Sequence, residues 1–345
     1  MSLADVPGQE FAVLSLRNAI RSGKVATAYL FHGPQGVGKR TTALAFAKAL
    51  NCAQQLDDAC DACSTCRRID RGVHPDVTLV GLLPGKTRLL IEQIKEIEHK
   101  LVFAPFEARR RVFIIDEADF MSPEATGAIL KTLEEPPEQT VFVLIAENQA
   151  MLPPTIISRC QSLRFSPLKA EAIRSLLEKR GMPPAASRLA SRLAQGSMER
   201  ALSIGQGDFL ERRHRLVELY FSTSPNDIGA LCGAAAELVG EKGRHAEGKE
   251  RRRRKLDDIL EIMLGWCRDI LVARCGGPQG LFVNEDLSEE IRKESSRLSH
   301  EQAQELVKAA LEAFRRAERN VLPEACIEAM FLRLSAVRSG SQSPS

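Results

Sequence analysis

A glycine-rich turn lies between an apolar run and a helical run and reads Gly33-Pro34-Gln35-Gly36-Val37-Gly38-Lys39. The main-chain N–H groups of such a turn, together with the N-terminus of the following helix, form a partly positive nest for phosphate oxygens. The ammonium of Lys39 adds a point charge to this nest. We therefore expect a nucleotide phosphate to bind at Gly33, Gly36, Gly38, Lys39, Arg40 and Thr41.

Arg40 occupies the position at which loops of this kind carry Ser or Thr, whose hydroxyl holds Mg²⁺ in hydrolytic sites. A guanidinium has only hydrogen-bond donors and cannot ligate a cation. Thr41, one residue later, points about 100° away around the helix. ATP with Mg²⁺ is thus a possible ligand of the loop, but Arg40 argues against hydrolysis.

The composition is that of a folded multidomain protein. The chain has 345 residues, of which 44% are apolar and 27% charged, and its net charge is +3. At about 150 residues per domain we expect two or three domains. The small net charge means that any contact with nucleic acid must come from local patches. No apolar run approaches the ~20 residues of a membrane span, so we expect a cytoplasmic protein without a membrane partner.

Five short β-branched or aromatic runs alternate with helical runs in the first half of the chain, at residues 28–32, 77–80, 112–115, 141–145 and 162–165. This alternation predicts a parallel sheet with helices on both faces, which binds ligands at the carboxyl ends of its strands. One intervening helix has a clear start and stop. Ser122 is its expected N-cap, Pro123 fits the first helical position, and Pro136-Pro137 ends it.

The pattern divides the chain into an α/β domain at residues 1–165, a small helical domain at 166–206, an all-α domain at 207–338 and a disordered tail at 339–345. The all-α domain contains a long helix whose apolar face includes Leu256, Leu260 and Met263. Just before it, the basic run Arg251 to Lys255 is expected to be part of a solvated loop running into the helix, with a DNA or phosphate patch as the alternative.

Asp116 and Glu117 follow the apolar run at 112–115 and form a second nucleotide signal. In phosphate-transfer sites, the first such carboxylate holds Mg²⁺ and the second polarises the attacking water. A turn with a helix cap is the simpler alternative. Because Asp116 and Glu117 follow a phosphate loop at a typical spacing, we interpret them as catalytic residues of a nucleotide-binding fold, with weak or vestigial activity.

Four cysteines lie within fifteen positions, at Cys52, Cys60, Cys63 and Cys66. Thiolates at such short spacings suit tetrahedral zinc, and a closed shell of four sulfurs leaves no open position for catalysis. We predict a structural zinc site, with an iron–sulfur cluster or unliganded thiols as alternatives. His74 is left out of the ligand set, because the following Pro75-Asp76 suggests a turn residue.

Arg159, in the turn Ser158-Arg159-Cys160, is a candidate catalytic residue of a different kind. An arginine at a helix end, presented at the surface, can reach a neighbouring subunit's γ-phosphate and neutralise charge in the transition state. In isolation, an ordinary surface salt bridge would be the simpler interpretation.

The first ~200 residues resemble the clamp-loader branch of the AAA+ ATPases. The resemblance rests on an ordered series of motifs: Gly8-Gln9, GPQGVGKRT at 33–41, the four cysteines, His74-Pro75-Asp76, IIDEAD at 114–119, LKTLEEPP at 130–137 and Ser158-Arg159-Cys160. It implies an AAA+ base, a helical lid and a collar that assembles a pentamer. The all-α domain matches only in its architecture.

The resemblance also implies a function. Clamp loaders place a sliding clamp on primed DNA, so the implied partners are tau/gamma motor subunits, a delta subunit, the clamp and DNA, close to the nucleoid. Arg159 would complete the ATP site of an adjacent motor subunit as a finger supplied in trans.

A hydrolysing tau/gamma-type motor is the alternative within the family. Three departures count against it: Arg40, the run Ala146-Glu147-Asn148 in place of a pair of threonines, and Glu199-Arg200, which puts the arginine one residue late. Motor subunits also commonly continue into further domains, whereas this chain ends soon after the collar. A DNA-binding module, built on Arg109-Arg110-Arg111 and Arg251 to Lys255, is a third hypothesis.

Overall fold

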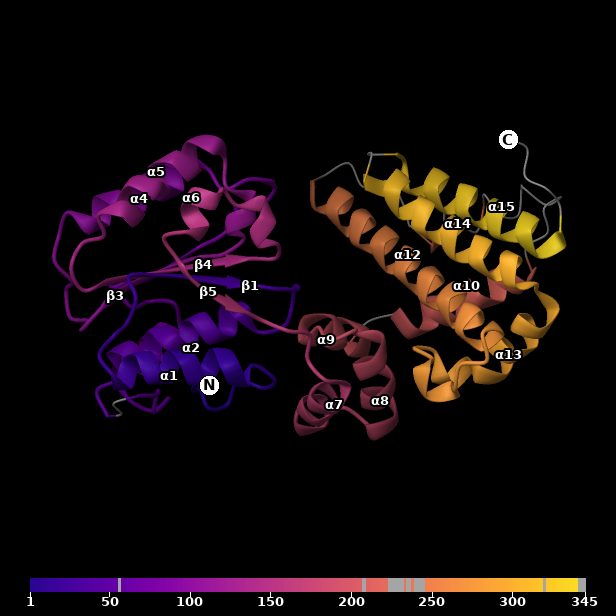
Figure 1. Cartoon of the computed structure of the whole chain (residues 1–345), viewed down its shortest axis with the longest axis horizontal. Helices are drawn as coiled ribbons and strands as arrows, with labels where there is room; N and C mark the ends of the chain where they lie inside the picture. The colour runs from indigo at the N-terminus through magenta and orange to yellow at the C-terminus, as the bar shows by residue number, and fades with distance from the viewer. Residues whose placement is uncertain are drawn as a thin grey trace. The chain divides into compact units, whose positions relative to one another are not determined.

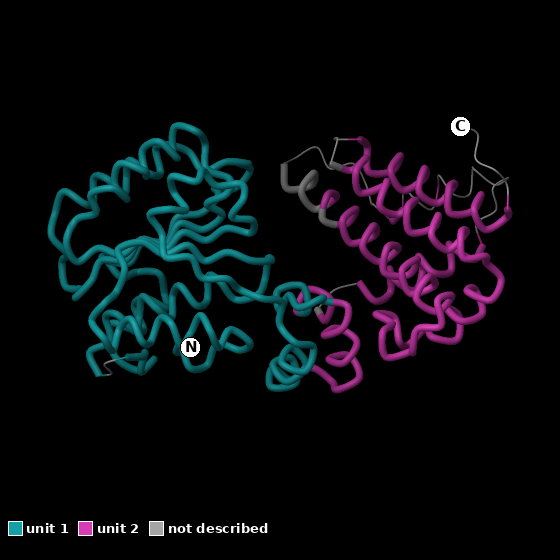
Figure 2. The backbone as a smooth tube through the Cα atoms, viewed as in Figure 1, with its two compact units in different colours: residues 1–181, 194–201 teal, residues 182–193, 202–345 magenta. Residues whose placement is uncertain are grey.

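The computed structural model describes residues 1–54, 57–206, 209–222, 233, 237–238, 246–318 and 321–340. It divides into two compact units, one of residues 1–181 and 194–201 and the other of residues 182–193 and 202–345 (Figure 2). The last helix ends at Ser339, the first residue of the segment predicted as a disordered tail, and Gly340 caps it. Residues 341–345 of that segment lie outside the described residues.

The first unit is built on a parallel five-stranded sheet, as the sequence predicted (Figure 1). The strands are β1 (Ala28–His32), β2 (Val77–Val80), β3 (Arg111–Ile115), β4 (Thr140–Ala146) and β5 (Gln161–Arg164), in the order β2-β3-β4-β1-β5. In this register Leu30 lies opposite Leu144 of β4 and Ser162 of β5. Each predicted strand is confirmed to within one residue at either end.

Side chains alternate between the two faces of the sheet along each strand, and helices cover both faces. Tyr29 and Phe31 pack against α1 (Glu10–Arg21) and α2 (Lys39–Asn51). Ala28 and Leu30 face the other side, which is covered by α4 (Ile91–Leu101), α5 (Pro123–Glu134) and α6 (Pro154–Ile157). Each fully buried large side chain contributes roughly 1.5–3 kcal/mol to this core.

Local signals fix the helix ends. Ser122 caps α5 as predicted, since its Oγ accepts a hydrogen bond from Ala125 N at 3.1 Å. The short α3 (Ser64–Asp70) lies between α2 and β2, and the 3-10 turns η1 (Ala118–Phe120) and η2 (Gln149–Met151) follow β3 and β4.

The strand order places three loops together. β1 lies between β4 and β5, and β3 lies beside β4, so the turn after β1 and the ends of β3 and β4 share one edge of the sheet. Gly33 N donates to Ala146 O at 3.3 Å across this edge. Such an edge, where the chain order of the strands is interrupted, is the usual ligand-binding position in this class of sheet.

The remaining elements are helical. They are α7 (Ala170–Lys179), α8 (Pro184–Leu193), α9 (Met198–Gln206), α10 (Phe209–Ser222), α12 (Ala246–Arg274), the 3-10 turns η3 (Gln279–Leu281) and η4 (Glu285–Leu287), α13 (Ser288–Arg297), α14 (His300–Glu318) and α15 (Pro323–Ser339). The long helix predicted in this region is α12, and Leu256, Leu260 and Met263 on its predicted apolar face are fully buried.

The basic run at the start of α12 takes part in packing within the second unit. Arg252 pairs with Glu324, and Arg253 donates to Ala317 O and pairs with Asp257. The side chains of Arg251 and Arg254 lie outside the described residues. The prediction of a solvated loop before the helix is therefore wrong, because the run lies within α12 and its described arginines are paired. These pairs also leave Arg252 and Arg253 less available to DNA than a free basic patch would be.

Candidate nucleotide site, arginine turn and cysteine cluster

The phosphate loop has a backbone that only glycine adopts easily. Gly33, Gly36 and Gly38 have φ angles of +146°, +72° and +100°, and α2 begins directly after Gly38. Space is equally restrictive, because a Cβ at Gly33 would lie 2.2 Å from Phe165 O and one at Gly36 would lie 2.1 Å from Ser197 Oγ. The loop thus turns tightly and leads directly into the N-terminus of α2.

Gln9, part of the Gly8-Gln9 motif, is hydrogen-bonded to the phosphate loop. Its buried amide donates to Val37 O at 3.2 Å and to Ser166 O at 2.8 Å, and accepts from Ser166 N at 3.1 Å. One side chain from the start of α1 therefore fixes both the phosphate loop and the segment that leaves β5.

Lys39 lies over the loop. Its side chain is only 7% exposed, and Nζ donates to Gly33 O at 2.5 Å and to Pro34 O at 2.7 Å. Burial lowers the pKa of Lys39, while carboxylates led by Glu147 and Asp116 oppose that shift. The ammonium is therefore held in place by backbone oxygens of the same turn.

Arg40 reaches Asp116. Its Nη1 lies 3.7 Å from Asp116 Oδ2, and the arginine is 60% exposed while the aspartate is 18% exposed. Burial raises the pKa of Asp116, and the guanidinium of Arg40 opposes this shift. The other carboxylate oxygen, Oδ1, accepts from Glu117 N at 3.0 Å. Two residues that the sequence singled out separately are thus brought together.

This arrangement does not fit a bound magnesium ion. The nearest hydroxyls on α2 belong to Thr41, which is exposed one residue further along, and to Thr42, whose Oγ1 donates to Gly38 O at 2.8 Å. The carboxylate that would complete the ligand set faces a guanidinium instead of an open position. The set of oxygen ligands that Mg²⁺ requires is therefore incomplete, and these residues do not support metal-assisted hydrolysis of a nucleotide.

Glu117 has a structural contact of its own. It takes a left-handed backbone with φ +54°, and its Oε2 accepts from Leu82 N at 3.1 Å. Sequence reasoning did not identify Asp119 as a functional residue, yet its Oδ2 accepts from Glu147 N at 2.9 Å and from Asn148 N at 3.3 Å. The ends of β3 and β4 are thereby tied to each other around acidic side chains.

Arg159 lies in the turn between α6 and β5 and is 34% exposed. Its Nη2 contacts Glu134 Oε1 at 2.7 Å, and its Nη1 donates to Thr155 O at 2.9 Å. Glu134 is itself 51% exposed and belongs to the LKTLEEPP motif at the end of α5. The guanidinium is therefore held at the surface by a partner that water also reaches, and such pairs are weak.

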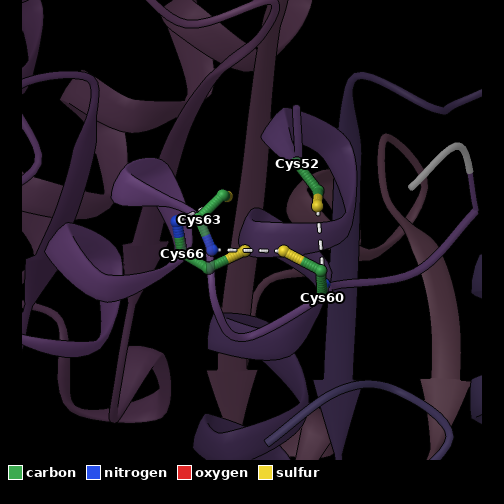
Figure 3. Close-up of side chains that lie close together, drawn as sticks. All are labelled: Cys52, Cys60, Cys63 and Cys66. Carbon is green, nitrogen blue, oxygen red and sulfur yellow. Dashed lines mark hydrogen bonds between the residues drawn. The ribbon is translucent and has the colours of Figure 1, made fainter. Parts of the chain in front are cut away.

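The four cysteines form one cluster (Figure 3). Their sulfur atoms all lie within 4.8 Å of one another, and tetrahedral zinc with Zn–S bonds of about 2.3 Å needs sulfurs about 3.8 Å apart. Main-chain N–H groups point at the sulfurs: Cys60 N lies 3.4 Å from Cys52 Sγ, Cys63 N 3.3 Å from Cys60 Sγ, and Cys66 N 3.4 Å from Cys63 Sγ. The geometry suits a tetrahedral metal ion.

The thiols of this cluster differ in their environments. Although burial opposes ionisation of Cys63, the backbone N–H groups of Cys66 and Ala53 lower its pKa to about 6. Burial and the neighbouring Cys63 thiol raise the pKa of Cys66. Metal ions bind cysteine as thiolate, so a metal ion held by all four sulfurs would displace the thiol protons.

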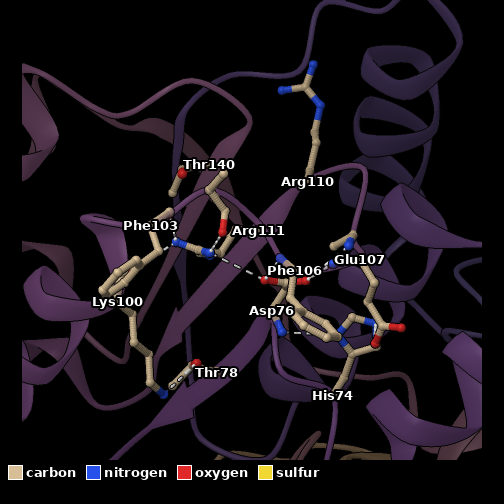
Figure 4. A network of polar contacts seen from close by, with 12 residues as sticks. His74, Asp76, Thr78, Lys100, Phe103, Phe106, Glu107, Arg110, Arg111 and Thr140 are labelled. Carbon is tan, nitrogen blue, oxygen red and sulfur yellow. Dashed lines mark hydrogen bonds and ion pairs between the residues drawn. The ribbon is translucent and has the colours of Figure 1, made fainter.

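His74 lies in a network that sequence reasoning did not foresee (Figure 4). Its Nδ1 accepts from Asp76 N at 3.2 Å, and Asp76 in turn accepts from the backbone N–H groups of Phe106, Glu107 and Ala108 at 2.9, 2.9 and 3.0 Å. Among the described residues, the group of side chains close enough to hold a metal ion consists of the four cysteines and does not include His74.

Arg111 completes this network. It is 7% exposed, approaches Asp76 Oδ1 to 3.4 Å and donates to the carbonyl oxygens of Phe103 and Ala104 at 2.8 and 2.6 Å. The side chain is therefore not available to DNA, which removes one of the three arginines on which a DNA-binding module was predicted. A charge at the first position of a buried strand was the signal that could have indicated a buried partner.

None of the helices in the described part of the chain is long and apolar enough to cross a membrane.

The sheet order, the glycine turn and the acidic end of β3 define a P-loop nucleotide-binding domain of the AAA+ class. A family profile described as "DNA polymerase III, delta subunit" matches residues 8–169. The chain is 31% identical over 320 residues to the delta prime subunit of DNA polymerase III from Bacillus subtilis, a match that covers 92% of this chain and 94% of the relative.

The tau subunit of the same organism is 31% identical over 325 residues, which cover 88% of this chain but only 56% of tau. Among solved structures, a gamma subunit-related protein from Thermotoga maritima is similar at 16% identity and a TM-score of 0.47, covering 94% of this chain and 99% of that one, a likeness too distant to carry an argument. The chain belongs to the DNA polymerase III clamp-loader family, and its match to the delta prime relative covers nearly the whole length of both chains.

Proposed function

We propose that this chain is the delta prime-type subunit of a clamp loader, which assembles with tau/gamma motor subunits and a delta subunit to place the sliding clamp on primed DNA. The full-length similarity to a delta prime subunit supports this assignment. In this proposal residues 1–165, 166–206 and 207–338 act as AAA+ base, lid and collar.

Arg159 carries the catalytic part of the proposal. It is a partly exposed guanidinium at the end of a short helix, held by a solvent-accessible glutamate, the main-chain carbonyl of Thr155 and a long hydrogen bond to the Ser158 hydroxyl. Such a group can leave its surface partner at little cost and neutralise charge on the γ-phosphate of a neighbouring motor subunit. The chain's own loop holds nucleotide without turning it over, because Arg40 faces Asp116 where a metal would be needed.

The four cysteines hold a structural zinc ion in this proposal. A four-sulfur shell has no open coordination position, so the metal supplies folding energy to the segment between α2 and α3 and takes no part in catalysis. Metal content of the purified chain, read by mass spectrometry, distinguishes zinc from iron or from free thiols.

Reconstitution with the motor and delta subunits tests the finger. Arg159→Ala should lower ATP turnover at the one neighbouring site by about 10³-fold, and the clamp- and DNA-stimulated rate of the complex by that site's share. Arg174→Ala is the matched control, since it removes a partly exposed arginine of α7 that also pairs with a glutamate. An unchanged stimulated rate in Arg159→Ala, with the complex intact by gel filtration, would make the finger assignment wrong.

The motor-type alternative has one observation in its favour, the 31% identity to tau. If the isolated chain turned over ATP and Glu117→Gln abolished that turnover, the chain would be an ATPase in its own right. The hydrogen bond that Glu117 accepts from Leu82 N would then be a ground-state contact of a catalytic base.

A further inference from the structure

We propose that the phosphate loop binds a nucleoside diphosphate free of magnesium, with the Arg40 guanidinium taking the place of the metal. This inference rests on the proposed nucleotide-holding role and states which species is held. It is independent of Arg159.

The first step concerns the cation. In a magnesium site a hydroxyl and an aspartate hold an ion beside the phosphates, whereas here the residue after Lys39 brings its own positive charge to Asp116, with 3.7 Å between Nη1 and Oδ2. The guanidinium is tethered to the first turn of α2 and is 60% exposed, so it retains donors for a phosphate oxygen. A mobile divalent ion is therefore replaced by a fixed monovalent one.

The second step concerns the charge that surrounds the loop. Met198 N donates to Gly36 O at 2.8 Å, and a Cβ at Gly36 would lie 3.0 Å from Glu199 Cβ, so Glu199 lies directly beside the turn. Asp119, which follows β3, accepts a hydrogen bond from the main chain of Glu147 at the end of β4, and both carboxylates act on the charge of Lys39. Carboxylates from three separate segments thus flank a loop whose own cations are Lys39 and Arg40.

These carboxylates act on one another. The pKa of Glu147 is raised, first by its partial loss of water and then by Asp119, Glu117 and Glu199, with Lys39 opposing the shift. A third phosphate would add negative charge among groups that already repel each other, with no divalent ion to offset it. A diphosphate, whose charge stays near the nest and the two cations, avoids most of this repulsion.

Calorimetric titration of the full chain with ADP and with ATP tests the inference. Magnesium is removed by passing the buffer over a chelating resin before the protein is added. A chelator in the calorimeter cell would also remove a metal ion from the cysteine cluster. We expect ADP to bind as tightly without Mg²⁺ as with it, and ATP to bind at least about tenfold more weakly than ADP in the magnesium-free buffer, a difference of about 1.4 kcal/mol.

Two variants give the matched comparisons. Arg40→Thr restores a hydroxyl and removes the guanidinium, so its ADP binding should become about tenfold tighter when Mg²⁺ is added. Glu199→Gln should reduce the discrimination against ATP. Arg109→Ala, which removes the same charge from an exposed position after α4, should leave every titration unchanged.

Wild-type binding that tightens tenfold with Mg²⁺, or ATP binding as tight as ADP binding, would overturn the inference. Absence of any nucleotide binding would overturn it together with the nucleotide-holding role, while the Arg159 finger would still stand or fall by the reconstituted ATPase.

Discussion

Two irregular segments of the first unit are ordered by different chemistry. Each lies at a buried aspartate that accepts three main-chain N–H groups. The cysteine loop, residues 52–54 and 57–66, contains its aspartate, Asp58, whereas the aromatic loop, residues 101–108, donates to Asp76, which lies outside it. Asp58 accepts from Leu3, Ala4 and Ala59 at 2.7, 3.1 and 2.7 Å. Asp76 accepts from Phe106, Glu107 and Ala108 at 2.9, 2.9 and 3.0 Å.

The difference lies in what accompanies the aspartate. The cysteine loop has four sulfurs within 4.8 Å of one another, whereas the aromatic loop and Asp76 both accept from the buried guanidinium of Arg111, the first residue of β3. With the proposed zinc bound, the first loop would depend on a metal ion that exchanges with solution, whereas the second depends on charged side chains of the protein itself. Phe103 and Phe106 of the aromatic loop are 65% and 82% exposed, so it has little apolar burial of its own to order it.

Loss of the metal should have the largest effect on stability and should disorder the cysteine loop but not the aromatic loop. We expect Cys66→Ser, or stripping of the metal, to lower the free energy of unfolding by up to about 4 kcal/mol, the value for a ligand present at a thousand times its dissociation constant. Hydrogen exchange should accelerate in the cysteine loop and stay slow at residues 106–108. Cys275→Ser, at an exposed cysteine of the other unit, is the control. Equal acceleration in both loops would mean that they are not independent.

Asp76→Asn should give the next largest effect, confined to the aromatic loop. The substitution leaves the Arg111 guanidinium, 8% exposed, without its carboxylate, and breaking such a buried pair costs about 3 kcal/mol. Urea unfolding of the metal-loaded chain measures the loss. In the double variant with Arg111→Met the penalty should be smaller than the sum of the two single losses, and strict additivity would show that the two residues do not interact.

The sequence predicted the features that depend on local patterns. The five strands follow from short apolar runs, and the phosphate loop and the cysteine cluster follow from residue types at fixed spacings. These signals need only neighbouring residues, so one sequence is enough to find them.

The features that were missed depend on contacts between distant residues. Asp76 looked like part of a turn and Arg111 like part of a basic patch, because 35 positions separate two side chains that the β2–β3 pairing brings together. The pair formed by Arg40 and Asp116 has the same origin, since each residue was singled out but their contact depends on the strand order. Sequence patterns do not give the order of strands in a sheet.

Low pH should remove the stability that the Asp76 carboxylate contributes to the aromatic loop. Although burial opposes ionisation, the N–H groups of Glu107, Phe106 and Ala108 and the Arg111 guanidinium hold the pKa of Asp76 below its usual range. A depressed carboxyl pKa contributes stability above the unfolded pKa of about 3.9, and this contribution is lost as the pH falls through the folded value. Each unit of depression is worth about 1.4 kcal/mol.

The stability difference between wild type and Asp76→Asn, measured by urea unfolding from pH 7 to pH 3, should therefore shrink below about pH 4. The cysteines lose metal in acid in both proteins, so that contribution cancels from the difference. A difference that stays constant down to pH 3 would show that the carboxylate charge of Asp76 does not contribute.

Asp58→Asn should have the smallest effect and gives the sharpest comparison, because it makes the same substitution at the other buried aspartate. Among the described residues no cation pairs with Asp58, and two of its three N–H donors, Leu3 and Ala59, share the single oxygen Oδ1. An asparagine can keep that oxygen in place and loses chiefly the bond from Ala4, so we expect a loss of about 1 kcal/mol. If Asp58→Asn cost as much as Asp76→Asn, the guanidinium of Arg111 would not be what distinguishes the loops. A smaller loss in Asp58→Asn would assign the difference between the two variants to the buried charge that only Asp76 neutralises.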